Sequence, residues 1–331
     1  MKKRVLNILT LIATIIIFLI VFESFLRISE YFTIKWQNNV QRQYIEPLEN
    51  LDYRETPDYE KHDYTIVVIG DSFTYGYGIN FSDTYSEILE SMIKARRKID
   101  VKIVNLGYPS FNIGEIYYIL KTEGIKYDPD LIIYSYYPND PEINPAAYYY
   151  CNLSTDEIFD LTVASSDLKI IKFIKMKTAG ISSNILDSND NFSMDSRGLY
   201  RELLNLKLYV YFHNIYLDDN VGWHCSKKII NRFKDIDSEK LFLIIPITPQ
   251  RDIFDSQIFY EKIIETASKN GFETLDMPSL LQNKTTGRKP SELYHSSSNP
   301  HFNRFTNTII AEGIYQYLFN DSKFIVNYVN T

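Results

Sequence analysis

One serine stands where a buried strand is expected to end. The stretch Tyr64–Gly78 (YTIVVIGDSFTYGYG) opens with the β-branched run 65–69, which is typical of a strand covered on both faces. Gly70 permits a sharp exit from that strand. Ser72 would then open the next helical turn, where unpaired backbone N–H groups point at whatever its hydroxyl attacks. The same residues also fit an ordinary turn in which Asp71 or Ser72 caps a helix.

A serine nucleophile needs a base, and the base must come from elsewhere in the chain. There are five histidines. His301 stands just before the last expected helix, in the sequence NPHFN (299–303), on a loop that should emerge where Ser72 emerges. A lone histidine is usually structural, so His301 is a candidate base only in combination with the serine.

Strands and helices alternate along the two parts of the chain that surround these residues. Polar or small residues follow the first three expected strands, and ligands of such sheets lie beyond the carboxyl ends of the strands. The pattern predicts a parallel sheet with helices on both faces. The expected strands are 65–69, 101–106, 131–136, 240–247 and 272–275, and the expected helices are 84–97, 113–121, 229–236, 260–269 and 303–319.

The alternation fails between about residues 141 and 220. This segment is rich in tyrosine and contains Ser/Asn/Asp-rich loops. It is predicted to be an insertion at one edge of the sheet, either a lid or substrate-recognition cap or a structural insertion without such a role.

Composition limits the classes of function. With 331 residues, 45% of them hydrophobic, the chain can bury a full core. Its net charge of −7 argues against a general nucleic-acid binder, since no surplus of basic residues is available for phosphates. No cysteine and histidine spacing resembles a zinc site, and no Gly-rich phosphate cradle with a following lysine is present. We therefore expect no metal and no cofactor.

The N-terminus carries the pattern of a membrane anchor. MKKR precedes the uncharged segment Val5–Phe22, and no small-residue cleavage site follows it. The positive-inside rule would leave the N-terminus in the cytoplasm and the remainder outside. The expected parts are a cytoplasmic stub and transmembrane helix (1–29), a stalk (30–61), an α/β domain (62–320) and a tail (321–331). In that compartment Cys151 and Cys225 could pair, and the sequence leaves open whether they do.

Four ordered blocks resemble one family. GDSFTYGYG (70–78), NLGYPS (105–110), YYPND (136–140) and NPHFNRFTNTIIAE (299–312) are similar to the blocks of the SGNH hydrolases, also called GDSL-type esterases and lipases. The resemblance covers roughly 62–140 and 222–320 and leaves the insertion unmatched. It implies a three-layer α/β/α fold with a parallel, flavodoxin-like sheet of five strands.

The resemblance also implies roles for individual residues. Ser72 matches the nucleophile, and its backbone N–H matches the first donor of the oxyanion hole. Asn139 matches the asparagine whose side-chain amide also donates there, and His301 matches the general base. The remaining donor is a backbone N–H for which Gly107 and Ser110 are the candidates, and Ser110 is preferred.

One position departs from the family pattern. The family has an aspartate two or three residues before the histidine, and this chain has Ser298 and Asn299 there. An amide oxygen can hold an imidazole N–H but brings no negative charge, and an Asp-to-Asn change in serine proteases costs about 10⁴ in rate. Three outcomes are open: support of His301 by a backbone carbonyl, Ser298 or Asn299, rescue by another carboxylate such as Glu292, or loss of catalysis.

The expected function is that of a membrane-anchored, extracytoplasmic serine esterase. It would form an acyl-enzyme on Ser72 and act on an O-acylated glycan or lipid ester. The membrane is an expected partner through the N-terminal helix, nucleic acid is not, and protein partners are left open. One alternative is an O-acyltransferase on a cell-surface polysaccharide. The other is a non-catalytic glycan-binding or scaffold protein that keeps the fold with a degraded triad. The sequence leaves the acyl group and the oligomeric state open.

Overall fold

The computed structural model describes part of the chain, and everything below concerns that part. The described residues are 14, 16–18, 20, 21, 23, 24, 51, 53, 54, 58–142, 151, 215–217, 220–246, 257–296 and 299–321. The chain divides into one unit formed by Pro47–Cys151 with Phe192–Thr331 and another formed by Met1–Glu46 with Asn152–Asn191. The α/β domain described here lies in the first unit.

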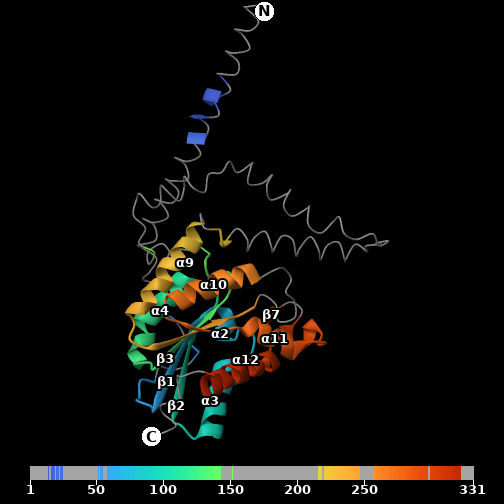
Figure 1. Ribbon diagram of the computed structural model, residues 1–331. Coiled ribbons are helices and arrows are strands. Elements are labelled where there is room, and N and C mark those ends of the chain that lie inside the picture. The colour runs from blue at the N-terminus through green and yellow to red at the C-terminus, as the bar shows by residue number, and fades with distance from the viewer. Residues whose placement is uncertain are drawn as a thin grey trace, which may run out of the picture. The chain divides into compact units, whose positions relative to one another are not determined.

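A five-stranded parallel sheet forms the centre of the domain (Figure 1). Its strands follow the order β2-β1-β3-β4-β5, and every neighbouring pair is parallel. All seven residues of β1 are buried, which explains why its sequence is apolar without alternation. The strand bounds are β1 Tyr64–Gly70, β2 Val101–Gly107, β3 Leu131–Tyr136, β4 Glu239–Ile244 and β5 Glu273–Leu275.

Helices cover both faces of this sheet, so the predicted parallel α/β architecture with five strands is confirmed. In Figure 1, α3, α11 and α12 lie on one face, and α4, α9 and α10 lie on the other. The helix bounds are α2 Ser72–Tyr75, α3 Tyr85–Arg97, α4 Ile113–Thr122, α9 Val221–Arg232, α10 Gln257–Lys269, α11 Met277–Thr285 and α12 Arg304–Gln316. Short 3₁₀ turns occupy Phe81–Asp83, Gly124–Tyr127, Phe233–Asp235 and Pro290–Glu292, and a π-turn at Tyr317–Asp321 extends α12.

The two faces have different cores. Alternate residues of the strands, such as Ile66 and Ile103, join Leu89 of α3 and Ile310 of α12 in one aliphatic cluster. The opposite face is aromatic: the rings of Tyr134 and Phe233 stack at 5.7 Å. The lateral neighbours of this pair are also aromatic, namely Tyr117, Phe242 and Phe272.

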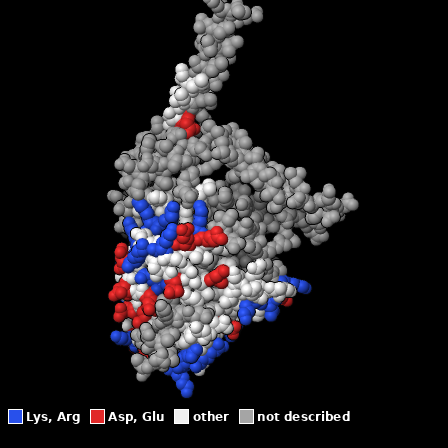
Figure 2. Space-filling model, viewed as in Figure 1, with Lys and Arg blue, Asp and Glu red and all other residues white. Residues whose placement is uncertain are grey.

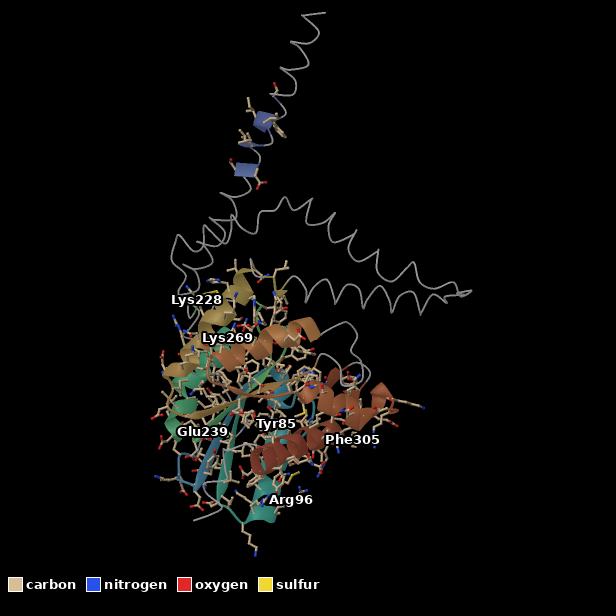
Figure 3. All side chains as sticks on the ribbon, viewed as in Figure 1. Tyr85, Arg96, Lys228, Glu239, Lys269 and Phe305 are labelled. Carbon is tan, nitrogen blue, oxygen red and sulfur yellow. A yellow bond between two sulfur atoms is a disulfide. The ribbon has the colours of Figure 1, made fainter. Side chains whose placement is uncertain are left out.

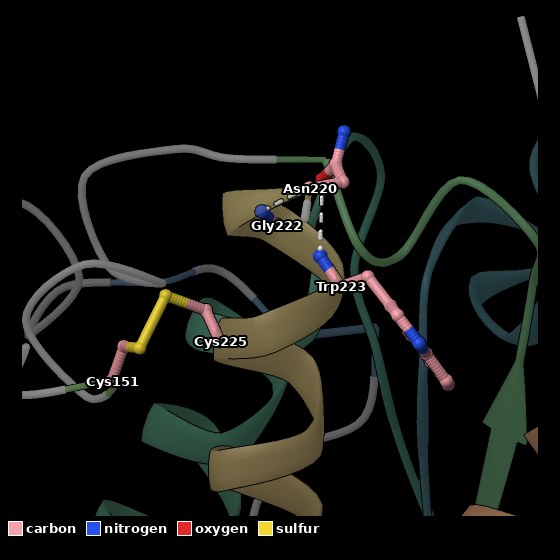
Figure 4. Close-up of a disulfide and its surroundings, with 5 residues drawn as sticks. All are labelled: Cys151, Asn220, Gly222, Trp223 and Cys225. Atoms are coloured by element: carbon pink, nitrogen blue, oxygen red, sulfur yellow. Dashed lines mark hydrogen bonds between the residues drawn. A yellow bond between two sulfur atoms is a disulfide. The ribbon is translucent and has the colours of Figure 1, made fainter. Parts of the chain in front are cut away.

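The structure corrects three sequence-based expectations about local structure. The helix predicted at 229–236 begins eight residues earlier, at Val221, because the Asn220 side chain accepts hydrogen bonds from the N–H groups of Gly222 and Trp223 (2.8 and 3.2 Å) and caps it there (Figure 4). Helix α11 was not predicted at all. His301 lies on a strand rather than on a loop, in the antiparallel hairpin of β6 (Tyr294–Ser296) and β7 (Asn299–Phe302).

Cys151 and Cys225 form a disulfide, the alternative that the sequence left open (Figure 4). Cys225 is a buried residue of α9, and Cys151 is buried as well. The bridge therefore joins the start of the predicted insertion to the helix that follows it. Most of the insertion, 141–220, lies outside the described residues, and so does the C-terminal tail beyond 321.

The predicted membrane anchor also falls largely outside the described residues. Those that are described between Thr14 and Ser24 are helical. No described helix has the length and apolar character needed to cross a membrane. Within the part of the surface that Figure 2 displays and the structure describes, basic and acidic side chains both occur in several groups, without the single-signed field that would attract a polyanion.

Candidate active site

Ser72 lies at the carboxyl end of β1, as the first residue of the short helix α2. The Asp71 side chain caps this helix by accepting a hydrogen bond from the N–H of Phe73 at 2.9 Å. Gly70 is required at the end of the strand because a Cβ there would lie 2.2 Å from Thr74 Oγ1 and 2.7 Å from the Ser135 carbonyl oxygen. The sequence thus builds a strand–turn–helix junction that presents the Ser72 hydroxyl at the sheet edge.

Helix α2 is hydrogen-bonded to α3 and β2 through Thr74. The Thr74 hydroxyl lies 3.0 Å from the hydroxyl of Tyr85, a buried residue of α3 (Figure 3). The side chain of Asn105, on β2, donates to the Thr74 carbonyl at 2.8 Å. A rigid α2 fixes the position of Ser72, which is its first residue.

The hairpin of β6 and β7 brings His301 to the serine. His301 Nε2 lies 2.7 Å from Ser72 Oγ, although the two residues are 229 positions apart in the sequence. The imidazole is half-buried, with its centroid 4.8 Å from the Phe73 ring and 5.2 Å from the Tyr77 ring. Burial lowers the pKa of His301, because removing water disfavours the charged form. The lowered pKa favours the neutral ring, which is the form in which an imidazole can accept a proton.

Asn299 is hydrogen-bonded to the ring nitrogen of His301 that faces away from Ser72. Its Oδ1 atom is 2.6 Å from His301 Nδ1 and also accepts from the His301 backbone N–H at 3.1 Å. An amide oxygen can only accept, so this contact assigns the ring proton to Nδ1 and leaves the lone pair of Nε2 for Ser72. Asn299 is itself held by its N–H, which donates to Ser296 Oγ at 3.1 Å.

The other candidates for supporting His301 have different positions. Glu292 accepts from the N–H of Lys289 within its own turn, and no hydrogen bond joins it to His301 in the described part of the chain. Ser298 lies outside the described residues. Of the side chains expected to support His301, Asn299 is the one that the described structure places within hydrogen-bond distance of its ring.

Strand order brings the two flanking loops to either side of Ser72. Gly70 is opposite Gly107 on β2 and opposite Ser135 on β3, so the segments with Ser110 and Asn139 leave the sheet beside α2. Ser110 is exposed and has a φ of 65°, the left-handed region that non-glycine residues rarely adopt. Such a strained residue is often found at functional sites.

Gly107 and Asn139 differ in what their polar groups contact. The Gly107 N–H donates to the Asn105 side chain at 3.0 Å, so this candidate donor already has a partner. A Cβ at Gly107 would lie 2.4 Å from the Tyr75 nitrogen, which shows how closely β2 approaches α2. Asn139 is half-buried, and its Oδ1 has no hydrogen-bond partner within the described structure.

Two buried carboxyl groups lie directly beside these residues in the sequence. Asp140 accepts from the Tyr134 hydroxyl at 2.8 Å and from the Tyr137 N–H at 3.3 Å. Burial raises the pKa of Asp71 to about 7. Burial, together with the charge of Asp71, raises the pKa of Asp140 well above its ordinary value. Burial thus favours the neutral form of both acids, and a charge on Asp71 further favours neutral Asp140.

The side chains of the site also bear on metal binding. In the described ranges, no group of three or more His, Cys, Asp or Glu side chains is placed to hold a metal ion. The chemistry that the described side chains can supply is nucleophilic attack by Ser72 with proton transfer to His301.

The chain was compared with family profiles, curated proteins and solved structures. No family profile matches the sequence, and no curated protein matches it. Similar solved structures do exist. Among them are acetylxylan esterases and a lipolytic protein of the G-D-S-L family.

Three of the neighbours illustrate the degree of similarity. A catalytic mutant of Axe2, an acetylxylan esterase from Geobacillus stearothermophilus, is 12% identical with a TM-score of 0.46, over 80% of this chain and 98% of its own. TesA is 12% identical with a TM-score of 0.43, over 77% and 98%. A protein assigned to the lipolytic G-D-S-L family, from Desulfitobacterium hafniense, is 13% identical with a TM-score of 0.40, over 77% and 99%. These similarities are distant, so the function is inferred below from the side chains of the site.

Sequence reasoning missed several residues that surround His301 and α2. Phe73, Tyr77 and Asp140 stand inside or beside the blocks that were recognised, so their proximity to the site could have been expected. Arg54 had no such signal, because it is one of two arginines in the predicted stalk (30–61) and stands outside the four blocks.

Proposed function

We propose that the chain is a serine esterase that works through an acyl-enzyme on Ser72. The observation that carries this proposal is the continuous hydrogen-bonded series from Ser72 Oγ to His301 Nε2 (2.7 Å) and from His301 Nδ1 to Asn299 Oδ1 (2.6 Å). A serine within hydrogen-bond reach of a base that is itself oriented by a third group is the geometry of an activated nucleophile.

The reaction would run in two halves. Ser72 Oγ attacks the acyl carbonyl while His301 Nε2 takes the hydroxyl proton, and the Ser72 N–H, the Ser110 N–H and the Asn139 amide stabilise the oxyanion. His301 then gives the proton to the departing alcohol, and the acyl group stays on Ser72. In the second half, water attacks the acyl-enzyme while His301 Nε2 takes its proton, and His301 returns this proton to Ser72 Oγ as the bond to the acyl group breaks and the acid leaves. Asn299 holds the ring in the required tautomer throughout.

The compartment is a second part of the proposal. The uncharged N-terminal segment would anchor the chain, and the α/β domain would lie outside the cytoplasm, facing O-acylated glycans or lipids. The Cys151–Cys225 disulfide supports this placement, since such bonds persist in oxidising compartments. A reporter that is active only in the cytoplasm, fused after Thr331, should be silent in the native host. A fully active fusion would rule out the outward orientation.

Covalent labelling tests the proposed chemistry. The full chain should react with a fluorophosphonate probe, and Ser72→Ala should abolish the reaction. Ser91→Ala, which changes an exposed serine on α3, serves as the matched control and should label like the wild type. A folded wild-type protein that does not label would contradict the esterase and would favour a non-catalytic binding role. If labelling occurs, release of acetate from an acetylated glycan, with and without an acceptor sugar, separates hydrolysis from acyl transfer.

A further inference from the structure

Helix α2 ends in a motif that ties the nucleophile to the loop behind it. The carbonyl oxygen of Ser72 accepts hydrogen bonds from the N–H groups of Gly76 (3.1 Å) and Tyr77 (3.0 Å), and the N–H of Gly76 also lies 3.3 Å from the Phe73 carbonyl. Gly76 has a φ of 74°. This is the Schellman arrangement, with a left-handed glycine directly after the helix. It satisfies only the first two carbonyl groups of a four-residue helix.

The other two carbonyl groups need partners from outside the helix, because a helix leaves its last four unpaired. The Thr74 carbonyl is bound by the side chain of Asn105 on β2. The Tyr75 carbonyl is bound by Arg54, whose Nη1 donates to it at 2.7 Å and to the Gly76 carbonyl at 3.0 Å. Arg54 thus completes the hydrogen bonding of the helix that carries Ser72.

The same guanidinium group holds the next turn of the chain. Arg54 Nη2 donates to the Ile79 carbonyl at 2.9 Å. The planar group lies over the rings of Tyr75 and Phe81, with Cζ to centroid distances of 4.8 and 5.6 Å. Arg54 therefore binds both ends of the loop 76–79 and packs on the aromatic rings beside it. A guanidinium group carries several N–H donors in one rigid plane, so it can bind carbonyl groups on both sides of the loop at once.

The clamped loop contacts the catalytic pair. Tyr77, within the loop, has its ring 5.2 Å from the imidazole of His301. Gly78 approaches Asn299 so closely that a Cβ on it would lie 2.4 Å from Asn299 Nδ2. The loop thus forms part of the wall against which both His301 and its supporting amide rest. A displacement of the loop would disturb the base and its orienting residue together.

We infer that Arg54 is a positioning residue for the proposed reaction of Ser72 and that the segment before the α/β domain takes part in the active site. This inference rests on the proposed esterase function, because it assigns Arg54 an effect on the reactivity of Ser72. Arg54 belongs to residues 30–61, for which the sequence predicted a stalk without chemistry. Its contribution is to hold α2 and the loop 76–79, and it does not contact the reacting atoms in the described structure.

The test measures labelling rates in the full-length protein. Arg54→Ala should lower the second-order rate constant for fluorophosphonate labelling by about 10- to 100-fold, the scale expected for a small misplacement of reacting groups. Arg54→Lys should recover only part of this loss, because an ammonium group cannot span both sides of the loop. Guanidinium chloride at a low, non-denaturing concentration should accelerate labelling of Arg54→Ala, and the same concentration of sodium chloride should not.

Arg96→Ala is a matched control. Arg96 lies on α3 and also stacks on a tyrosine, with its Cζ 4.9 Å from the centroid of Tyr315 (Figure 3). Its removal should leave the labelling rate unchanged. Wild-type rates in Arg54→Ala would overturn the inference, and so would a slow Arg54→Ala protein that neither guanidinium nor lysine improves.

Hydrogen exchange separates this inference from the proposed function. Arg54→Ala should exchange the amide hydrogens of 75–80 faster than the wild type, and Arg96→Ala should not. If the wild type does not label, the esterase proposal fails, but faster exchange in Arg54→Ala still supports a role of Arg54 in holding α2 and the loop 76–79. If exchange over 75–80 is unchanged in Arg54→Ala, Arg54 does not hold this loop, whatever the labelling result.

Discussion

The Oδ1 atom of Asn299 accepts two hydrogen bonds from His301, one from the ring Nδ1 at 2.6 Å and one from the backbone N–H at 3.1 Å. The orientation of the imidazole is thus fixed by a neutral acceptor. In a site with an aspartate at this place, orientation and charge come from the same group. Here they are separated, so the effect of the charge can be measured on its own.

Asn299→Asp should make the site faster at alkaline pH. A carboxylate would stabilise the imidazolium that forms in the transition state, and we expect a gain of about tenfold or more in the rate of p-nitrophenyl acetate hydrolysis at pH 8. The pH dependence should move as well. Burial lowers the pKa of His301 in the wild type, which keeps the ring neutral and active to lower pH. The added carboxylate raises that pKa, so the acid limb of the pH–rate profile should shift to higher pH.

Asn299→Leu is the control for orientation. It removes the acceptor without adding charge and should slow the reaction. An Asn299→Asp protein that is folded yet slower than the wild type at pH 8 would show that the amide is preferred for another reason.

Asn139→Ala should lower the rate of ester hydrolysis by about 10²–10³-fold, the loss typical of one oxyanion-hole donor. Substrate binding in the ground state should change little, because the donor acts where charge develops. Asn80→Ala, in an exposed loop, provides the comparison and should keep full activity. Equal activity of the Asn139→Ala and Asn80→Ala proteins would remove Asn139 from the oxyanion hole.

Gly107→Ala should destabilise the protein by about 1–3 kcal/mol, as overpacking does. The new Cβ would lie 2.4 Å from the Tyr75 nitrogen and 2.6 Å from Thr74 Cβ, both in α2. Urea unfolding measures the effect, and labelling of Ser72 should slow because α2 must move. At Gly313 a Cβ would meet the flexible end of Leu280, 2.9 Å away, and alanine is favoured inside a helix. Gly313→Ala should therefore cost clearly less, and equal losses for the two variants would contradict the proposed contact.

Asp140→Asn should reduce the pH dependence of stability. The pKa of a buried carboxyl is raised, so the folded protein keeps protons that the unfolded chain releases above about pH 4. The contribution of these two carboxyl groups to the free energy of unfolding is therefore greatest at low pH. It falls as the pH rises toward about 7, the pKa of Asp71. Removing one of the two acids should shrink the fall in the free energy of unfolding between pH 5 and pH 8 by about 1 kcal/mol or more.

The measured quantity is the difference in the free energy of unfolding between pH 5 and pH 8. Any loss of stability that the substitution causes equally at both pH values therefore cancels. Asp128→Asn changes an exposed aspartate with a φ of 48°, a conformation that asparagine tolerates, and should leave the pH dependence as in the wild type. An unchanged dependence in Asp140→Asn would mean that other groups cause it.

Much of the fold follows from local sequence patterns. β1 and β3 are continuous apolar runs between polar turns, and the helix over 84–97 has its N-cap at Thr84 and basic residues in its last turn. Such signals lie within each element and can be recognised without knowledge of its neighbours. The predicted start of helix α9 was wrong. Asn220, which caps this helix, belongs to the stretch that was assigned to the insertion.

The candidate site was predictable only in part, and the reason is physical. Ser72, His301 and Asn139 stand at strand ends or before a helix, where the topology brings them together. The partner of His301 depends on the geometry of a hairpin that two three- to four-residue strands form, and short strands carry little periodicity. Arg54 acts through backbone carbonyl groups, which every residue has, so no pattern of side chains marks it.

The Cys151–Cys225 bond has a consequence for how the chain withstands cleavage. The cysteines are 74 positions apart, so 73 residues lie between them. Ser72 lies before this segment and His301 lies after it. The bond therefore links the part of the chain with Ser72 to the part with His301 even if the segment is cut. A protease that cuts anywhere in 152–224 would open a ring without releasing either half. Such a nicked protein would run as one species on a non-reducing gel and as two after reduction, with Ser72 and His301 on different fragments.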